Sequence, residues 1–157
     1  GRIIGEACHF IDFLTYLVGE NPTAVSTQGL PDQGKYHEDN VVMQFNFPDG
    51  SIGVVSYLAN GDKSYPKEYL EVFSSGRIAV LDDWRKLELI VNGKRKVKRH
   101  ILAQDKGHKN AWLAFQNAVM EKNLPPIPYE QVLGVSEAAF AAVESLRTCE
   151  KVNFTTK

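Results

Sequence analysis

One histidine in the sequence stands between two carboxylates at spacings that suit proton transfer. His9 follows Glu6 by three residues and precedes Asp12 by three. In a helix, this spacing places the three side chains along one face. A carboxylate beside an imidazole orients the ring and favours its charged form, which suits a general acid or base near neutral pH. A hydrogen-bonded polar stripe at a domain interface fits the same spacing, so the residues alone leave both interpretations open.

The remaining candidate motifs make no self-sufficient catalytic site. The sequence contains no glycine-rich phosphate-binding loop, no Walker motif and no Gly-x-Ser-x-Gly elbow. His37, His100 and His108 are scattered among polar neighbours, so we expect no metal site. Cys8 and Cys149 lie far apart and form no Cys-x-x-Cys pair. We expect both cysteines to be reduced, buried thiols.

A dense basic run is the second feature that could do chemistry. Five of the six residues from Lys94 to Arg99 are cations. Such a run can grip a polyanion through its phosphates. However, it falls on a predicted hairpin arm, with cations on both faces and no aromatic residue among them, which is typical of a charged edge strand that resists aggregation. We expect the edge strand, and polyanion binding remains the alternative.

Composition narrows the class of protein. The 157 residues are 43% hydrophobic, which suits one domain with a core of its own. With 18 basic and 19 acidic residues, the charge gives no whole-surface argument for nucleic acid or a membrane. No apolar run approaches the roughly 18 residues of a membrane span, and the N-terminus lacks the longer apolar core and cleavage site of a signal peptide. The two cysteines, which we expect to be reduced, lead us to expect a cytoplasmic protein. The chain opens almost at once on Ile3 and Ile4 without an initiator Met, and we expect either a fragment or a processed product.

Hydrophobic periodicity and turn residues predict the order of the elements. Helices are predicted at about residues 6–18, 106–122 and 129–149. Strands are predicted at 23–27, 40–47, 52–58, 69–74, 77–81, 85–91 and 95–102, with a loop at 30–39 and a short closing strand at 152–154. The clearest hairpin turn is Asn92-Gly93, a type I′ signature.

This order of elements determines the expected fold class. Consecutive strands joined by tight turns must pair antiparallel, because a parallel crossover needs a dozen residues or more. We therefore expect an α+β fold, a predominantly antiparallel sheet with helices packed on one face. We expect residues 1–157 to form a single domain of this kind.

Three motifs in this order carry a resemblance to a known family. The first is the run Arg2-Ile3-Ile4-Gly5-Glu6-Ala7-Cys8-His9-Phe10-Ile11-Asp12, with its His-x-x-Asp, in a helix that ends near Leu17-Val18-Gly19. The others are Lys106-Gly107-His108, followed by a helix with Phe115, and the last helix from Glu137 to Leu146. Together they resemble the C-terminal domain of Gfo/Idh/MocA-type oxidoreductases over nearly the whole chain.

The resemblance implies a partner domain, a cofactor and a substrate class. Members of this family join an N-terminal Rossmann domain, which binds NAD or NADP, to an α+β domain that builds the substrate pocket. They oxidise or reduce sugars, inositols and related polyols by hydride transfer, and the sheet of the second domain often makes a dimer contact. The resemblance therefore implies a substrate-binding and oligomerisation domain without its Rossmann domain. The cofactor-binding residues remain unassigned, and this fragment alone should be inactive. The implied partners are a small sugar or polyol, the absent Rossmann domain and a second copy, with neither nucleic acid nor membrane.

The resemblance also assigns roles to individual residues. His9 matches the family's active-site histidine, which we expect to contact the reacting hydroxyl. Glu6 is expected as a secondary polar contact of the substrate, and Asp12 is expected to orient His9 or the helix. Many members carry an aspartate four residues before the histidine, where this sequence has Gly5. A non-catalytic oligomerisation or ligand-binding module of the same fold is the alternative interpretation.

Overall fold

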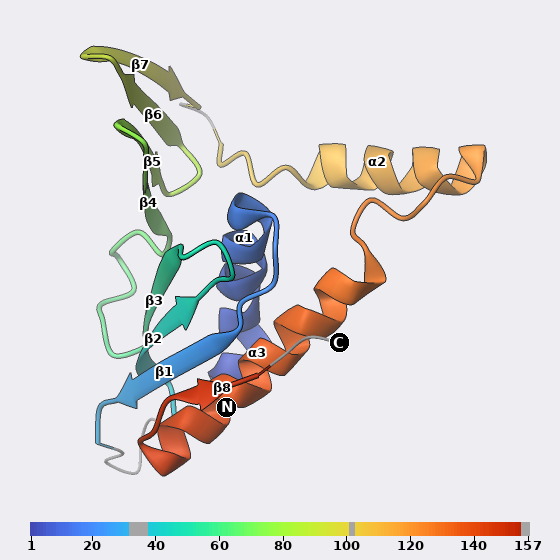
Figure 1. Ribbon diagram of the computed structural model, residues 1–157. Helices are drawn as coiled ribbons and strands as arrows, with labels where there is room; N and C mark the ends of the chain where they lie inside the picture. Colours follow the sequence, from blue (N-terminus) through green and yellow to red (C-terminus); the bar gives the residue numbers. More distant parts are fainter. Residues whose placement is uncertain (32–37, 101–102, 155–157) are drawn as a thin grey trace. The chain divides into compact units, whose positions relative to one another are not determined.

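The residues that the structure describes form three α-helices, one short π-helix and eight strands. The computed structural model describes residues 1–31, 38–100 and 103–154, so the predicted loop at 30–39 and the end of the predicted strand at 95–102 lie partly outside the described residues. The helices are η1 (Ile3–Ala7), α1 (Cys8–Val18), α2 (His108–Glu121) and α3 (Tyr129–Thr148) (Figure 1). The strands are β1 (Ala24–Gly29), β2 (Asn40–Asn46), β3 (Ile52–Leu58), β4 (Tyr69–Ser74), β5 (Arg77–Asp82), β6 (Lys86–Val91), β7 (Lys94–Arg99) and β8 (Val152–Asn153).

The predicted α+β class and the antiparallel pairing are confirmed. The strands form two four-stranded sheets, in the orders β3-β2-β1-β8 and β4-β5-β6-β7. Every pair of neighbouring strands is antiparallel. The chain divides into two compact units, a first unit of residues 1–60 and 124–157 and a second unit of residues 61–123.

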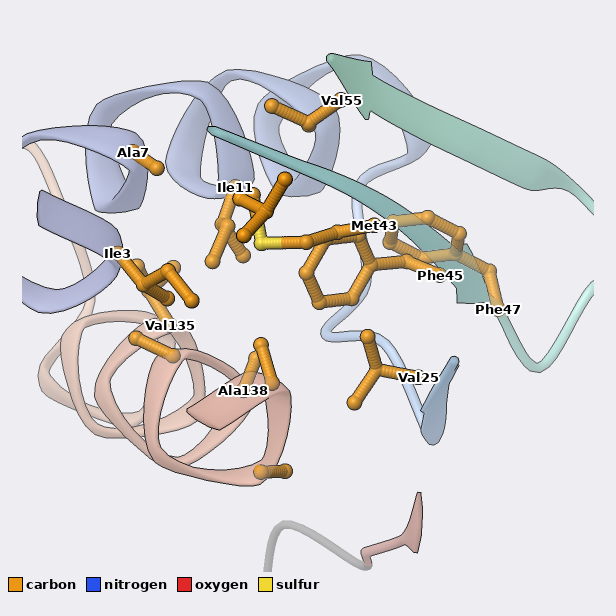
Figure 2. Close-up of a cluster of buried hydrophobic side chains, with 14 residues drawn as sticks. Ile3, Ala7, Ile11, Val25, Met43, Phe45, Phe47, Val55, Val135 and Ala138 are labelled. Carbon is orange, nitrogen blue, oxygen red and sulfur yellow. The ribbon is translucent and has the colours of Figure 1, made fainter. Parts of the chain in front are cut away.

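In the first unit, helices α1 and α3 cover one face of the sheet. Strand β2 shows why, because Val41, Met43 and Phe45 alternate with exposed or half-buried residues and are themselves almost fully buried. They meet apolar side chains of η1, α1 and α3, as Figure 2 shows. The buried core consists of Ile3, Ala7, Ile11, Val25, Val41, Met43, Phe45, Phe47, Val55, Val135, Ala138, Ala139, Ala141 and Ala142.

A buried hydroxyl joins α3 to the sheet. Ser145 is 1% exposed, and its Oγ accepts a hydrogen bond from the backbone N–H of Thr27 at 2.9 Å. The same hydroxyl donates to the carbonyl of Glu150 at 2.6 Å. Strand β8 pairs only with Ala24 and Val25 of β1, so the Ser145 hydroxyl satisfies the Thr27 N–H beyond the end of β8.

The second unit is built from successive hairpins. Asn92 and Gly93 both have positive φ, at 50° and 70°, which confirms the type I′ turn between β6 and β7. Strand β7 forms one end of its sheet, and all six of its residues are exposed, which confirms the predicted charged edge strand.

The register of this sheet separates its charges between the two faces. Lys94, Lys96 and Lys98 lie opposite Val91, Leu89 and Leu87, so these three lysines share one face with apolar side chains. Arg95 lies on the other face, where its Nε meets the Glu88 carboxylate at 2.8 Å.

Two predictions fail, each for a physical reason. The first helix does not begin as an α-helix at Glu6, because residues Ile3–Ala7 form a π-helix in which the Cys8 N–H reaches the carbonyl of Ile3. The expectation that both cysteines are buried is wrong for Cys149, which is exposed, while Cys8 is half-buried and both are free. Cys149 follows the last residue of α3 with a positive φ of 59°, where the chain turns away from the helix.

None of the helices in the described ranges is both long enough and apolar enough to span a bilayer.

Candidate functional site

Helices α1 and α3 of the first unit border an open groove of about 310 Å³. This volume lies at the lower end of the range for small-molecule sites. From η1 and α1 the groove is lined by Ile4, Cys8, His9 and Asp12, and from α3 and the residues before it by Ile127, Val132, Val135, Ser136, Ala139 and Phe140.

The polar side of the groove comes from α1. His9 is exposed at the surface of the groove, and Asp12 is half-buried. The opposite face of the same helix points into the core, where Ile11 and Thr15 are buried. The helix ends at Gly19, whose φ of 88° is the left-handed conformation that glycine adopts readily, and the Gly19 N–H bonds the carbonyl of Thr15. Packing against the core therefore fixes the orientation of α1, so that the face with His9 and Asp12 lies at the groove.

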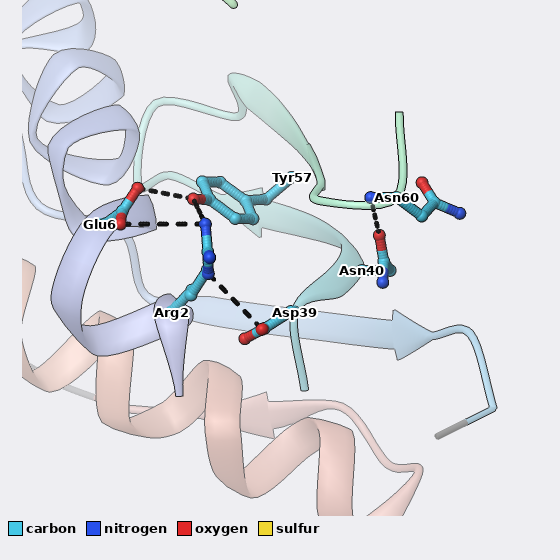
Figure 3. A network of polar contacts seen from close by, with 6 residues as sticks. All are labelled: Arg2, Glu6, Asp39, Asn40, Tyr57 and Asn60. Atoms are coloured by element: carbon cyan, nitrogen blue, oxygen red, sulfur yellow. Dashed lines mark hydrogen bonds and ion pairs between the residues drawn. The ribbon is translucent and has the colours of Figure 1, made fainter. Parts of the chain in front are cut away.

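Glu6 does not line this groove. Its carboxylate accepts a hydrogen bond from the Tyr57 hydroxyl at 2.7 Å, and the Arg2 guanidinium lies 4.0 Å away, as Figure 3 shows. Arg2 also meets Asp39 at 3.5 Å. Burial, followed by hydrogen bonding to Glu6, raises the pKa of Tyr57, so its hydroxyl remains a donor over a wide pH range.

The π-helix accounts for this separation. The prediction that Glu6, His9 and Asp12 share one face assumes 3.6 residues per turn throughout. A π-turn holds a residue more than an α-turn, so the side chains before Cys8 are rotated relative to those after it. The structure thus brings His9 and Asp12 together at the groove and directs Glu6 to Tyr57 of β3.

Sequence reasoning missed the residues that α3 contributes. Gln131 donates its side-chain amide to Asp12 Oδ1 at 3.2 Å, across 119 positions of sequence. Ser136 lines the groove and donates its hydroxyl to the Val132 carbonyl at 2.9 Å. Phe140 lines the groove and is 57% exposed. The only available signal was the helical spacing of four between Ser136 and Phe140, which any exposed helix face can show.

The groove suits a ligand that is part hydroxylated and part apolar. An imidazole and a carboxylate on the α1 side can bond hydroxyl groups, while Val132, Ala139 and Phe140 can contact carbon. Among residues 1–31, 38–100 and 103–154, no three His, Cys, Asp or Glu side chains gather as a metal site would require.

Comparison with known proteins gives a family and a fold. The model of the oxidoreductase family, C-terminal alpha/beta domain (GFO_IDH_MocA_C), matches residues 1–154. No curated protein matches the sequence.

Solved structures share the fold at low identity. A levoglucosan dehydrogenase in complex with NADH is 19% identical, with a TM-score of 0.79, 99% of this chain covered and 50% of that one. The aldose-aldose oxidoreductase from Caulobacter crescentus, complexed with glycerol, is 19% identical, with a TM-score of 0.72 and 94% and 45% of the two chains covered. An oxidoreductase from Agrobacterium radiobacter, in complex with NAD+, L-tartaric acid and magnesium, is 13% identical, with a TM-score of 0.76 and 94% and 47% covered. The chain therefore spans about half the length of these proteins.

Proposed function

The chain belongs to the Gfo/Idh/MocA oxidoreductase family through its C-terminal alpha/beta domain, and we propose that it is the substrate-binding and oligomerisation domain of an NAD(P)-dependent dehydrogenase. The substrate class is a sugar, an inositol or a related polyol. Two of the similar structures support this class, since they hold glycerol or belong to a levoglucosan dehydrogenase. In this proposal residues 1–157 act as one domain of a longer two-domain protein.

The observation that carries the proposal is the position of His9. Its imidazole is exposed on the wall of an open groove, in the same groove as Asp12, rather than sealed in the core. A ring nitrogen of His9 can accept the proton of a substrate hydroxyl as that alcohol is oxidised, or return it in the reverse direction. The carboxylate of Asp12 lines the same groove and can accept a hydrogen bond from a substrate hydroxyl. Our assignment is that His9 is catalytic and Asp12 contacts the substrate or orients His9.

Glu6 takes a different place in this proposal. Since its carboxylate bonds Tyr57, any contact with substrate would come from beyond the groove that holds His9. Gly5, where many family members have an acid, contributes no side chain, and the space around it is open, because a Cβ added there would meet no atom within 4 Å. A polar group of the substrate, or of another part of the protein, can fill that space.

The described residues do not fit a dinucleotide. Such cofactors bind at the start of a helix that follows a parallel strand in a βαβ unit, with a glycine-rich turn between them. All the strand pairs described are antiparallel, and no such turn occurs in the sequence. We therefore assign NAD or NADP to another part of the longer protein, and the proton transfer to this chain.

The test is replacement of His9 in the full-length protein. With NAD+ or NADP+ and a panel of aldoses, inositols and anhydrosugars, His9→Ala should lower turnover by about 10²–10⁴-fold, the usual contribution of a general acid or base. His100→Ala, in the second unit, is the matched control and should retain full turnover. Unchanged turnover in His9→Ala would instead favour the non-catalytic ligand-binding module.

We also propose that the first sheet forms a dimer through its outer face. Val42, Val54 and Ile52 are 43%, 57% and 62% exposed on the face opposite α1 and α3. Apolar side chains in such numbers on one sheet face are typical of an interface. Sedimentation of the full-length protein should show a dimer that Val54→Lys weakens, and a strict monomer at high concentration would contradict the proposal.

A further inference from the structure

One hydrogen bond links the polar side of the groove to the opposite helix. The side-chain amide of Gln131, in the first turn of α3, donates to Asp12 Oδ1 at 3.2 Å. Asp12 lines the groove and Gln131 does not. Among the described residues the structure shows no further hydrogen bond or ion pair of Asp12, with His9 or with any other side chain, so its second oxygen, Oδ2, is left for a ligand.

The first turn of α3 is itself held in place on both sides of Gln131. The Gln131 N–H bonds the carbonyl of Pro128 at 3.1 Å. The side-chain amide of Asn21, just beyond α1, donates to the carbonyl of Glu130 at 3.0 Å. Gly134 makes this approach possible, because a Cβ there would collide with the Asn21 amide. The Gln131 side chain is therefore presented to Asp12 from a fixed backbone.

The chemistry of the pair suits a site that needs a carboxylate. An amide N–H orients an oxygen of the carboxylate but carries no charge. An Arg or Lys at the same place would hold Asp12 as firmly while cancelling its negative charge. A neutral donor from α3 fixes the direction of the carboxylate and leaves its charge available.

We propose that Gln131 is a positioning residue of the groove, which holds the Asp12 carboxylate in one place on the wall that His9 also lines, where a ligand can reach both groups. This inference rests on the proposed function only in that it takes His9 as the catalytic group beside Asp12. Gln131 acts through Asp12 and itself touches no ligand. Without it, Asp12 regains rotamer freedom, and the geometry between carboxylate and imidazole is lost.

The experiment reads the imidazole directly and needs no substrate. In the full-length protein labelled with ring-15N histidine, the His9 signals are assigned by their loss in His9→Gln. Asp12→Asn and Gln131→Leu should change the 15N chemical shifts of the His9 ring in the same direction, because both substitutions remove an oriented carboxylate. Gln116→Leu, an exposed glutamine of α2, is the matched control and should leave the His9 signals in place.

An exchanged pair separates positioning from simple helix pairing. Gln131→Glu alone sets two carboxylates against each other and should lower the Tm. Combining Gln131→Glu with Asp12→Asn restores an amide–carboxylate bond with reversed polarity, so the Tm should recover while the His9 signals stay as in Asp12→Asn. If Gln131→Leu does not fold, Gln131→Asn, whose amide is too short to reach, takes its place with the same expected shift.

Two results would overturn the inference. In one, Asp12→Asn moves the His9 signals but Gln131→Leu does not, or neither variant moves them. In the other, the exchanged pair restores the His9 signals as well as the Tm, which would mean that Gln131 only joins two helices. Neither result depends on turnover, so the fate of the proposed function is decided separately by His9→Ala.

Discussion

The two units of this chain use the same kind of sheet in opposite ways. In the first, α1 and α3 cover one face, and large side chains such as Phe45 and Met43 are completely buried. In the second, the described residues include a single buried side chain, and it is the carboxylate of Glu88. Helix α2 contains no buried residue at all. One unit is thus stabilised by a hydrophobic core, the other by backbone pairing, cross-strand contacts and ion pairs.

The difference explains where the candidate site lies. A groove with defined geometry needs walls that do not move, and the helices bordering it are anchored by the core on their other faces. Ile11 of α1 and Val135 of α3 both belong to that core, which fixes Asp12 and Gln131 relative to each other. In the second unit no comparable packing fixes the exposed lysines of β7.

The largest contrast is expected when one phenylalanine is removed from each unit. Phe45→Ala opens a cavity in the first unit and should lower the free energy of unfolding by about 3–5 kcal/mol. Phe73→Ala removes a side chain that is 68% exposed. This substitution should change the free energy of unfolding by no more than about 0.5 kcal/mol. Urea unfolding followed by circular dichroism measures both, and similar losses would contradict the contrast between the two units.

A smaller contrast is expected for two serines. Ser145→Ala leaves the buried N–H of Thr27 without its acceptor, which should cost about 1–3 kcal/mol. Ser74, at the exposed end of β4, has no such role. Ser74→Ala should therefore leave the urea midpoint of the chain unchanged within error. An equal effect of the two serine substitutions would mean that the Thr27 N–H finds another acceptor.

The smallest effect concerns pH and the second unit. The Lys86 hydrogen bond, and then the charge of Arg95, lower the pKa of Glu88 below its ordinary value of 4.5. A carboxyl group whose pKa is lower in the folded than in the unfolded state stabilises the fold at pH values above its unfolded pKa. That stabilisation is lost as the pH falls through the folded pKa. Glu88→Gln should therefore lower the Tm of the second unit near neutral pH, and the difference from wild type should vanish in acid.

Tryptophan fluorescence can measure this effect. Trp84 and Trp112, the two tryptophans of the chain, both lie in the second unit, so their emission reports on its unfolding. The Tm difference between wild type and Glu88→Gln is followed from about pH 7 down to about pH 3. A difference that stays constant over this range would show that the Glu88 ion pairs do not stabilise the fold.

Much of the secondary structure could be predicted from the sequence, because it depends on local rules. The alternation in β2 and the Asn92-Gly93 turn each fix a conformation through a few neighbouring residues. The antiparallel pairing followed from the short turns alone. The π-turn could not be predicted from local rules. It replaces an ordinary helix turn and buries Ile3 and Ala7, and that burial depends on α3, which is far away in the sequence.

Only part of the candidate site could be predicted from the sequence. The His9–Asp12 spacing is a property of one helix, so the sequence alone determined that these two groups share a face. Which other groups join them depends on packing between segments more than a hundred residues apart, and neither Gln131 nor the diversion of Glu6 to Tyr57 has a local signature. Short-range geometry gave this protein its strands, its turns and its histidine–aspartate pair. Only the tertiary structure decided what faces that pair, because long-range contacts are selected by the burial of the whole core.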